Sequence, residues 1–265
     1  MFKQRLLTTL VLLPLVLAII YCAPAWMLFG VLLLLIGGCS WEWAQLIPLE
    51  RTEYKLMYLV AVQLVIGLVA LSVSPWLFVG LVCWLLILCA ILGYPHSQSW
   101  WGYPLVVGGL GMLLLPIFAN VMMGLYQTAH GQDLMVYVLS LVWAADIGAY
   151  LAGKRWGRHK LIPKVSPGKT MEGSAGGVTL VLLVALIGYI LFKPESAVLW
   201  FLTALLTALI SILGDLFISL LKRRSQLKDS GHILPGHGGL LDRLDSSLAA
   251  LPLFYMALSC LELGR

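Results

Sequence analysis

Apolar runs, each about long enough for one helix to cross a bilayer, fill most of this chain of 265 residues. Hydrophobic residues make up 61% of the chain and charged residues only 11%, whereas a soluble domain carries roughly 25% charged residues. The pattern therefore predicts an all-α, polytopic membrane protein with about nine transmembrane helices. The predicted spans are 5–21, 24–40, 55–74, 76–93, 104–125, 134–153, 173–192, 197–221 and 240–262.

The basic residues between these spans fall mainly on one side of the predicted membrane. If the N-terminus is cytoplasmic, only Lys193 and Arg265 of the 17 Lys and Arg residues lie on the opposite side. Positive residues are enriched in cytoplasmic loops, so the bias predicts a cytoplasmic N-terminus. It also places the two polar loops, 154–172 and 222–241, on the same face. Topology explains the net charge of +5, and we expect no nucleic-acid partner.

The chemistry-bearing residues gather in the second half of the chain. We therefore expect about five N-terminal spans in 1–130 and a C-terminal catalytic membrane region in 131–265. The five cysteines lie in or beside apolar stretches and form no Cys-x-x-Cys pair. This arrangement is typical of buried small hydrophobic residues and indicates neither a disulfide framework nor a zinc site.

Carboxylates inside predicted spans are the first functional signal. Asp146 and Asp215 each lie within an apolar run, where a charged group is costly unless it faces a cavity or a partner. Asp242 and Asp245 enter the last span from the same side and, three residues apart, share one helix face. Four carboxylates at similar depth repel one another unless protons or cations occupy the site. Oxygen-rich sites suit hard cations, above all Mg²⁺.

Structural interpretations of these carboxylates remain open. Asp146 or Asp215 could pair with a loop lysine and hold two helices together. Asp242 and Asp245, beside Arg243, could form an ordinary charge cluster at a helix start. Glu42 lies between Trp41 and Trp43 at the end of the second span, and we interpret it as an anchor at the membrane interface.

The first polar loop, 154–172, carries six basic residues against one Glu. Ser166-Pro167-Gly168 predicts a turn, and Thr170 or Ser174 could cap the following helix. A helix N-terminus beside lysines is a good anion site. Gly168-Lys169-Thr170 also resembles the tail of a P-loop, but the first glycine is missing and no strand is predicted before it. Attraction to anionic lipid headgroups is the simpler alternative for the lysines.

The second polar loop, 222–241, is rich in glycine and charge. The segment from Pro235 to Gly239 can expose successive backbone N–H groups to a phosphate. His232 and His237 could bind metal, transfer protons or contact phosphate, or simply fill a polar loop. Lys222 and Arg223 lie at a helix end, where the helix dipole favours cations. Loops that bind phosphate beside carboxylates that bind metal favour phosphoryl or nucleotidyl transfer onto a lipid.

One long pattern resembles a known family. It reads Ser219-x-x-Lys222-Arg223-x₄-Lys228-Asp229-x-Gly231-x-x-Leu234-Pro235-x-His237-Gly238-Gly239-x-x-Asp242-Arg243-x-Asp245. This is similar to the signature of the phosphatidate cytidylyltransferases, also called CDP-diacylglycerol synthases. Two upstream patterns support the resemblance, Asp146-x-x-Ala149-Tyr150-x-x-Gly153 and Lys164-x-Ser166-Pro167-Gly168-Lys169-Thr170-x-Glu172-Gly173. The resemblance covers about 140–250 strongly and 1–130 more loosely.

The resemblance implies an enzyme that transfers CMP from CTP to phosphatidic acid, giving CDP-diacylglycerol and pyrophosphate in phospholipid biosynthesis. It implies dependence on one or two Mg²⁺ ions, with a monovalent cation such as K⁺ as a further candidate. It also implies a homodimer of multi-pass subunits among the lipids of a bacterial inner membrane, with the active site at the cytoplasmic interface. Specificity for cytidine follows from the resemblance alone.

The hypothesis assigns roles to individual residues. The expected catalytic residues are Asp215, Lys222, Arg223, Asp242 and Asp245. Of these, the carboxylates Asp215, Asp242 and Asp245 are the expected metal ligands. The expected substrate-binding residues are Asp146, Tyr150, Lys164, Ser166, Lys169, Thr170, Lys228, Asp229, His237, Gly238, Gly239 and Arg243.

Other functions fit parts of the sequence. A polyprenol or dolichol kinase, or a synthase for an archaeal ether lipid, would also use CTP and a lipid acceptor. A CDP-alcohol phosphotransferase is disfavoured because its Asp-Gly…Ala-Arg…Gly…Asp…Asp pattern is missing from the sequence. An ion-coupled transporter would use Asp146 and Asp215 as coupling sites, although no inverted repeat of broken helices is recognisable.

Overall fold

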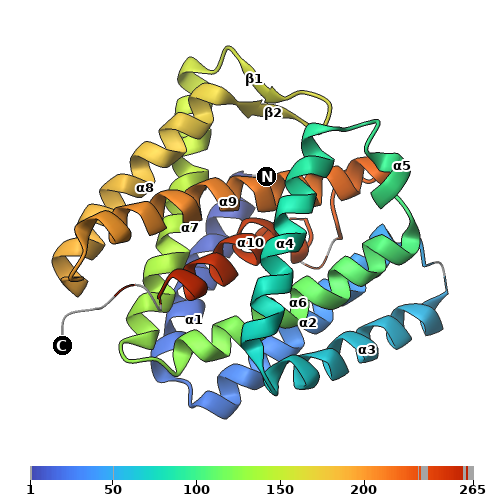
Figure 1. The fold of residues 1–265 in the computed structure, drawn as a ribbon, viewed down its shortest axis with the longest axis horizontal. Coiled ribbons are helices and arrows are strands. Elements are labelled where there is room, and N and C mark those ends of the chain that lie inside the picture. The colour runs from blue at the N-terminus through green and yellow to red at the C-terminus, as the bar shows by residue number, and fades with distance from the viewer. Residues whose placement is uncertain (1, 50, 232, 234–237, 259–260, 262–265) are drawn as a thin grey trace. The chain divides into compact units, whose positions relative to one another are not determined.

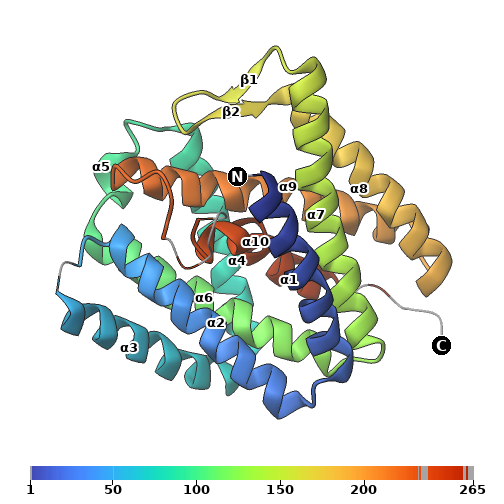
Figure 2. The same ribbon diagram turned by 180° about the vertical axis from the view of Figure 1, so that it is seen from behind.

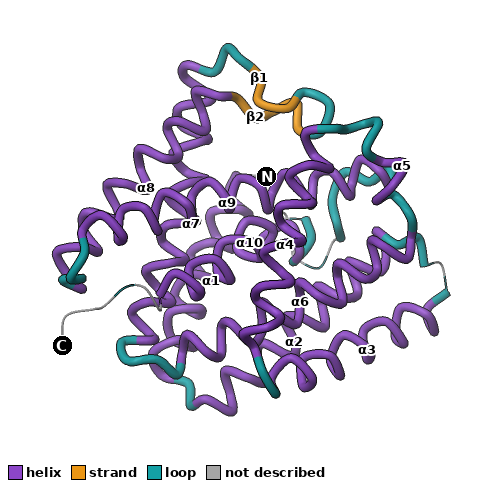
Figure 3. The backbone as a smooth tube through the Cα atoms, in the orientation of Figure 1, coloured by secondary structure: helices purple, strands orange, loops and turns teal. Residues whose placement is uncertain are grey.

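Helices dominate the computed structural model of this chain, as Figure 3 shows. The structure describes residues 2–49, 51–231, 233, 238–258 and 261, with side chains from residue 10 onward. Among these residues, each of the nine predicted spans coincides with one helix, and a short additional helix, α5, precedes α6 (Figure 1). The helices are α1 (Phe2–Cys22), α2 (Ala25–Leu46), α3 (Thr52–Ala70), α4 (Val73–Leu92), α5 (Gln98–Trp101), α6 (Pro104–Tyr126), α7 (Gly131–Trp156), α8 (Met171–Phe192), α9 (Ala197–Arg224) and α10 (Leu241–Leu258).

Seven of the described helices are long and apolar enough to cross a membrane: α2, α3, α4, α6, α7, α8 and α9. In α1 the described apolar part, Leu10–Cys22, is shorter, and α10 begins with charged residues. The predicted all-α, multi-pass class is therefore confirmed. That all nine helices cross the membrane, and that the N-terminus is cytoplasmic, remain predictions.

The first polar loop folds into a β-hairpin, which the sequence analysis did not predict. Strand β1 (Lys160–Ile162) pairs antiparallel with β2 (Ser166–Thr170). The prediction of a turn at 166–168 is wrong, because the turn lies between the strands and there the Val165 N–H donates to the Ile162 carbonyl. Proline lacks an N–H, but the outer side of a two-stranded sheet needs no such donor. The hairpin joins α7 to α8 (Figures 1 and 2).

The chain forms two compact units, each assembled from separate stretches of sequence. The first unit comprises Met1–Trp76, Gly102–Val136 and Leu221–Leu244. The second unit comprises Leu77–Trp101, Tyr137–Leu220 and Asp245–Arg265. Each polar loop therefore belongs to a different unit, 154–172 to the second and 222–241 to the first.

In the first unit, α2, α3 and α6 pack side by side (Figures 1 and 2). Two aromatic side chains donate hydrogen bonds to the backbone of α6, Trp43 to the Val107 carbonyl at 2.9 Å and Tyr58 to the Gly108 carbonyl at 2.9 Å. A Cβ at Gly111 would collide with both aromatic groups. Hydrogen bonds and small residues are what hold helices together when the surroundings are as apolar as the side chains.

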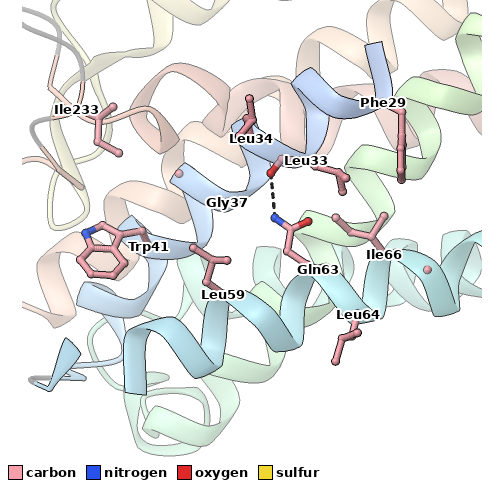
Figure 4. A pocket seen from close by; sticks show the side chains of 12 residues that line it. Phe29, Leu33, Leu34, Gly37, Trp41, Leu59, Gln63, Leu64, Ile66 and Ile233 are labelled. Atoms are coloured by element: carbon pink, nitrogen blue, oxygen red, sulfur yellow. Dashed lines mark hydrogen bonds between the residues drawn. The ribbon is translucent and has the colours of Figure 1, made fainter. Parts of the chain in front are cut away.

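A groove of about 700 Å³ runs between α2 and α3 in the same unit (Figure 4). Its lining is apolar except for Gln63, whose amide group donates to the Leu33 carbonyl at 2.9 Å. Ile233, from the second polar loop, also lines the groove. The second polar loop therefore reaches an apolar surface formed by two candidate membrane helices.

In the second unit, α7 and α8 meet along a line of glycines, which we call the glycine seam: Gly148, Gly173, Gly176 and Gly177. A Cβ at Gly177 would lie 2.7 Å from the Ala145 carbonyl oxygen, and one at Gly148 would lie 2.5 Å from the Gly176 carbonyl oxygen. Contacts this short leave no room for a side chain. The two helix backbones therefore touch directly, just below the β-hairpin.

Candidate active site

A polar cavity of about 350 Å³ lies in the second unit, within the usual range of small-molecule sites, about 300–1,000 Å³. Helices α7, α8 and α9 and strand β2 contribute its walls. Five residues predicted from the sequence to act at the site line it: Asp146, Tyr150, Lys169, Thr170 and Asp215. The structure thus brings together residues that are widely separated in the sequence.

Lys169 and Asp215 face each other in this cavity. The Lys169 ammonium group lies 2.7 Å from the Asp215 carboxylate and 3.4 Å from the Ile212 carbonyl, to which it donates. Each side chain is about a quarter exposed, 23% and 27%. A pair between a loop lysine and an intramembrane carboxylate is the contact that the structural interpretation of Asp215 anticipated, and it also holds a cation inside the cavity.

The β-hairpin that carries Lys169 is fixed at its base. Thr170 caps α8 as predicted, with its hydroxyl accepting from the Gly173 N–H at 3.1 Å. The Glu172 carboxylate accepts from the Arg158 N–H at 3.1 Å and lies 2.6 Å from the His159 ring nitrogen. Because these contacts tie both ends of the hairpin to α8, Lys169 enters the cavity from a defined backbone.

Asp245 belongs to the same electrostatic environment. Its carboxylate interacts with those of Asp215 and Asp146 and with the Lys169 cation. Close helix packing explains this, because a Cβ at Gly214 would collide with the Asp245 carbonyl oxygen. Clustered carboxylates favour binding of a cation, and carboxylate oxygens suit Mg²⁺, although Lys154 lines the cavity as well as Lys169. In the described part of the chain, however, no three Asp, Glu, His or Cys side chains are already arranged around one metal position.

A second polar cluster lies in the first unit, where α9 ends and α10 begins. The Lys222 ammonium group lies 2.6 Å from the Asp242 carboxylate, with side chains only 15% and 8% exposed. The other oxygen of Asp242 accepts from the Ser230 N–H at 2.9 Å and the Gly239 N–H at 3.1 Å. These additional hydrogen bonds fix the position of the Asp242 carboxylate, so the shielded Lys222–Asp242 pair has a well-defined geometry.

The backbone N–H groups at the end of this loop already have acceptors. The Gly239 N–H donates to Asp242, and the Leu240 and Leu241 N–H groups donate to Glu42 at 3.0 and 2.8 Å. Of the predicted phosphate-binding segment from Pro235 to Gly239, the Gly239 N–H thus binds a protein carboxylate in this conformation, and residues 235–237 lie outside the described residues. Gly238 adopts φ of 83°, a conformation that glycine tolerates best.

Glu42 is not an interfacial anchor, and this interpretation of the sequence is wrong. Its side chain is fully buried, and from the described residues it accepts three hydrogen bonds: those from Leu240 and Leu241 and a third from the Ser230 hydroxyl at 3.1 Å. A tertiary contact with the second polar loop overrides the local preference for an interface. The signal in the sequence was the carboxylate itself, since a charge at the end of an apolar run requires partners.

Comparison with known proteins shows the family of the chain. The model of the cytidylyltransferase family matches residues 3–261. The chain belongs to the cytidylyltransferase family. It is 40% identical to a phosphatidate cytidylyltransferase of Pseudomonas aeruginosa over 96% of both chains. It is 34% identical to the enzyme of that name from Haemophilus influenzae, over 96% of this chain and 97% of the relative. A Bacillus subtilis relative of the same name is 43% identical over 49% of each chain.

Several residues of this cytidylyltransferase that the sequence singled out lie outside the cavity. Lys164 occupies the exposed turn of the β-hairpin, and Ser166 begins β2. Arg223 and Arg243, on α9 and α10, are exposed, as are Lys228 and Asp229 in the second polar loop. His232 and His237 lie outside the described residues.

Arg224 is a structural cation that the sequence analysis did not assign to the site. Its guanidinium group donates to the Gly102 carbonyl at 2.6 Å and to the Leu46 carbonyl at 2.9 Å. The Ser225 hydroxyl donates to the same Leu46 carbonyl at 3.0 Å. Arg224 thereby fixes the end of α9, immediately after Lys222 and Arg223. Three consecutive basic residues in the sequence gave no signal of which one faces inward.

Proposed function

We propose that this cytidylyltransferase transfers CMP from CTP to phosphatidic acid and releases pyrophosphate and CDP-diacylglycerol. The observation that carries the proposal is the 40% identity, over nearly the whole of both chains, with a phosphatidate cytidylyltransferase. The polar cavity supports it, because it combines cations for phosphate with carboxylates for a metal ion. Its walls belong to candidate membrane helices, where a lipid acceptor is available.

In the proposed reaction, a phosphate oxygen of phosphatidic acid forms a bond to the α-phosphorus of CTP. The bond between this phosphorus and the oxygen that bridges to the β-phosphate breaks, and pyrophosphate leaves with that electron pair. Phosphatidic acid is already ionised, so no strong general base is required. The main task of the protein is to position the two phosphates and to neutralise their charge.

Lys169 and Lys222 suit that task. Each is held beside a carboxylate, Asp215 and Asp242 respectively, so its charge has a counter-ion before any substrate binds. A phosphate that arrives can then share the ammonium group without exposing an unpaired buried charge. Arg223, Lys164 and Lys228 are exposed and are proposed to guide and hold the outer phosphates of CTP.

We further propose that Asp215, Asp242 and Asp245 hold one or two Mg²⁺ ions, with K⁺ as a candidate second cation. Repulsion among the carboxylates of Asp146, Asp215 and Asp245 supports a cation in the second unit. When bound, Mg²⁺ would neutralise charge on the attacked phosphate and on the departing pyrophosphate. Asp146 is proposed to orient a basic side chain or to hold the metal through a water molecule.

The proposed setting is the inner membrane of a bacterium. The seven long apolar helices support a multi-pass protein, and the relatives named above are bacterial. The distribution of basic residues in the sequence favours a cytoplasmic N-terminus and a site facing the cytoplasm. By analogy with the family, the working form is proposed to be a homodimer.

The first experiment incubates detergent-purified protein with phosphatidic acid and α-labelled CTP, with and without Mg²⁺. Label in a lipid-extractable product only when Mg²⁺ is present supports cytidylyl transfer. Transfer of label from γ-labelled CTP would instead indicate a lipid kinase, and product formed only with an ether lipid would indicate a different acceptor. Cation-dependent uptake into proteoliposomes without chemical change would indicate a transporter.

A further inference from the structure

Both ends of the second polar loop are attached to the last turns of α2. At the α9 end of the loop, Arg224 and Ser225 donate to the Leu46 carbonyl. At the α10 end, the Leu240 and Leu241 N–H groups donate to the Glu42 carboxylate. Glu42 and Leu46 are four residues apart, so the two attachment points are about one helical turn apart on α2.

The Glu42 carboxylate has hydrogen-bond donors on both of its oxygens. One oxygen accepts from the Ser230 hydroxyl and the Leu241 N–H, and the other accepts from the Leu240 N–H. The carboxylate also stands at the N-terminus of α10, where the helix dipole favours a negative charge. No lysine, arginine or histidine among the described residues forms an ion pair with it. The described hydrogen-bond donors to this carboxylate therefore all belong to the second polar loop and the start of α10.

Glu42 is linked to the Lys222–Asp242 pair through shared donors. Ser230 gives its hydroxyl to Glu42 and its N–H to Asp242. Gly239 gives its N–H to Asp242, and the next two N–H groups along the chain go to Glu42. The two carboxylates thus hold residue 230 and the start of α10 together.

Two glycines of the signature pattern are explained by the same contact. A Cβ at Gly231 would lie 2.6 Å from the Glu42 carboxyl carbon, and one at Gly239 would lie 2.6 Å from a Glu42 oxygen. Any side chain there would push the loop away from α2. The absence of side chains at these two positions therefore leaves room for Glu42, which lies far outside the signature pattern.

We propose that Glu42 is a positioning residue that holds the second polar loop on α2 so that Lys222 and Asp242 meet in one geometry. This inference rests on the proposed function only for its effect on the reaction. Glu42 touches neither substrate nor reacting atoms in this role; it acts through Ser230 and the N-terminus of α10.

The test compares Glu42→Gln with Ser40→Ala in the full-length, detergent-purified protein. Glutamine keeps the size of the side chain but turns one acceptor oxygen into a donor that faces a backbone N–H. Ser40 is a matched control because it is also fully buried on α2, but its hydroxyl donates to the Ile36 carbonyl of its own helix. Removing it leaves the loop contacts intact.

The first readout is hydrogen–deuterium exchange of the backbone amides of Leu240 and Leu241, which donate to Glu42, and it needs no substrate. We expect exchange in Glu42→Gln to be roughly ten- to hundredfold faster, the range for loss of a hydrogen bond to a charged group. Ser40→Ala should leave it unchanged. Equal exchange in Glu42→Gln and the parent protein would overturn the inference, whatever the result of the assay with labelled CTP.

The second readout is steady-state kinetics with CTP and phosphatidic acid. We expect Glu42→Gln to lower kcat by about 10- to 100-fold, the usual effect of losing a residue that orients a site, with a smaller change in KM. Ser230→Ala should also lower kcat. The kcat of the double variant should equal that of Glu42→Gln alone, because both residues act through one network. Unchanged kcat, or fully additive losses, would count against positioning through Ser230.

Two outcomes separate this inference from the proposed function. If the parent protein makes no labelled lipid, the proposed function fails, and the exchange measurement still decides whether Glu42 holds the loop. If Glu42→Gln does not accumulate in membranes, Glu42→Asp replaces it, since aspartate keeps the charge but its side chain is one methylene group too short to keep the contacts with Leu240 and Leu241. Wild-type exchange in that variant would then overturn the inference.

Discussion

The Lys169 ammonium group of β2 lies 2.7 Å from the Asp215 carboxylate of α9. The contact joins a β-hairpin to the C-terminal half of α9, a candidate membrane helix. Each partner supplies what the other requires, since the carboxylate needs a counter-charge inside an apolar helix and the lysine needs an anchor inside a cavity. This pair lines the polar cavity that we propose as the site for CTP and metal.

Asp215→Asn should abolish most activity while leaving the protein folded. Asparagine keeps the size of the side chain and removes the negative charge from the apolar helix, so the protein should still fold. Activity should fall roughly 100-fold or more, as for other groups that stabilise charge developing in a transition state. Near-normal turnover of a folded Asp215→Asn protein would contradict a role in metal or phosphate binding. Restored activity in the charge-swapped variant Lys169→Asp/Asp215→Lys would favour a purely structural pair.

Lys222→Met should destabilise the protein more than the loss of an exposed lysine. Asp242 is only 8% exposed, and removing one partner of a buried pair typically costs about 3–5 kcal/mol. Thermal unfolding in detergent measures the effect, with Lys160→Met in the exposed part of β1 as the control. Equal unfolding temperatures for the two variants would mean that Asp242 finds another partner.

Gly148→Val should separate α7 from α8. Its Cβ would lie 2.5 Å from the Gly176 carbonyl oxygen, and overpacking of this kind usually costs about 1–3 kcal/mol. Because the same helices carry the β-hairpin, activity should fall together with stability. Gly30→Ala on α2 is the control, since nothing lies within 4 Å of a Cβ there, and alanine in a helix is roughly 0.5–1 kcal/mol better than glycine. A stable, active Gly148→Val protein would contradict the direct contact of the α7 and α8 backbones at the glycine seam.

Chelation should reveal the proposed metal. We expect EDTA to abolish label transfer from α-labelled CTP and added Mg²⁺ to restore it. Asp245→Asn should require a higher Mg²⁺ concentration for half-maximal activity, because one carboxylate of the cluster that includes Asp215 and Asp146 is lost. Full activity in EDTA would exclude a dissociable divalent ion from the reaction.

The sequence was sufficient to locate the helices because their signal is local. A run of about 20 apolar residues has few alternatives in a membrane, and each predicted span coincides with a helix among the described residues. The Thr170 cap was predictable for the same reason, since a capping hydroxyl acts within one turn. Residues such as Asp146 and Asp215 were recognisable because a charge inside an apolar run stands out.

The rest depends on contacts between distant stretches. The β-hairpin has short strands that contain Pro167 and Gly168, so its β propensity is weak, and the Glu172 contacts that fix it are tertiary. Glu42 could not be paired with the second polar loop, because nearly 190 residues separate it from its hydroxyl donor Ser230. Likewise, three adjacent basic residues could not reveal that Arg224 faces the backbone of α2 and the segment before α6.

The glycine seam also bears on how the protein is made. Helix α7, the hairpin and α8 are contiguous in the sequence, so they can assemble as soon as α8 has left the ribosome. Asp215 is synthesised later, on α9, so Lys169 has already been made when this carboxylate reaches the membrane. We expect this order of synthesis to let Lys169 neutralise the carboxylate as α9 inserts.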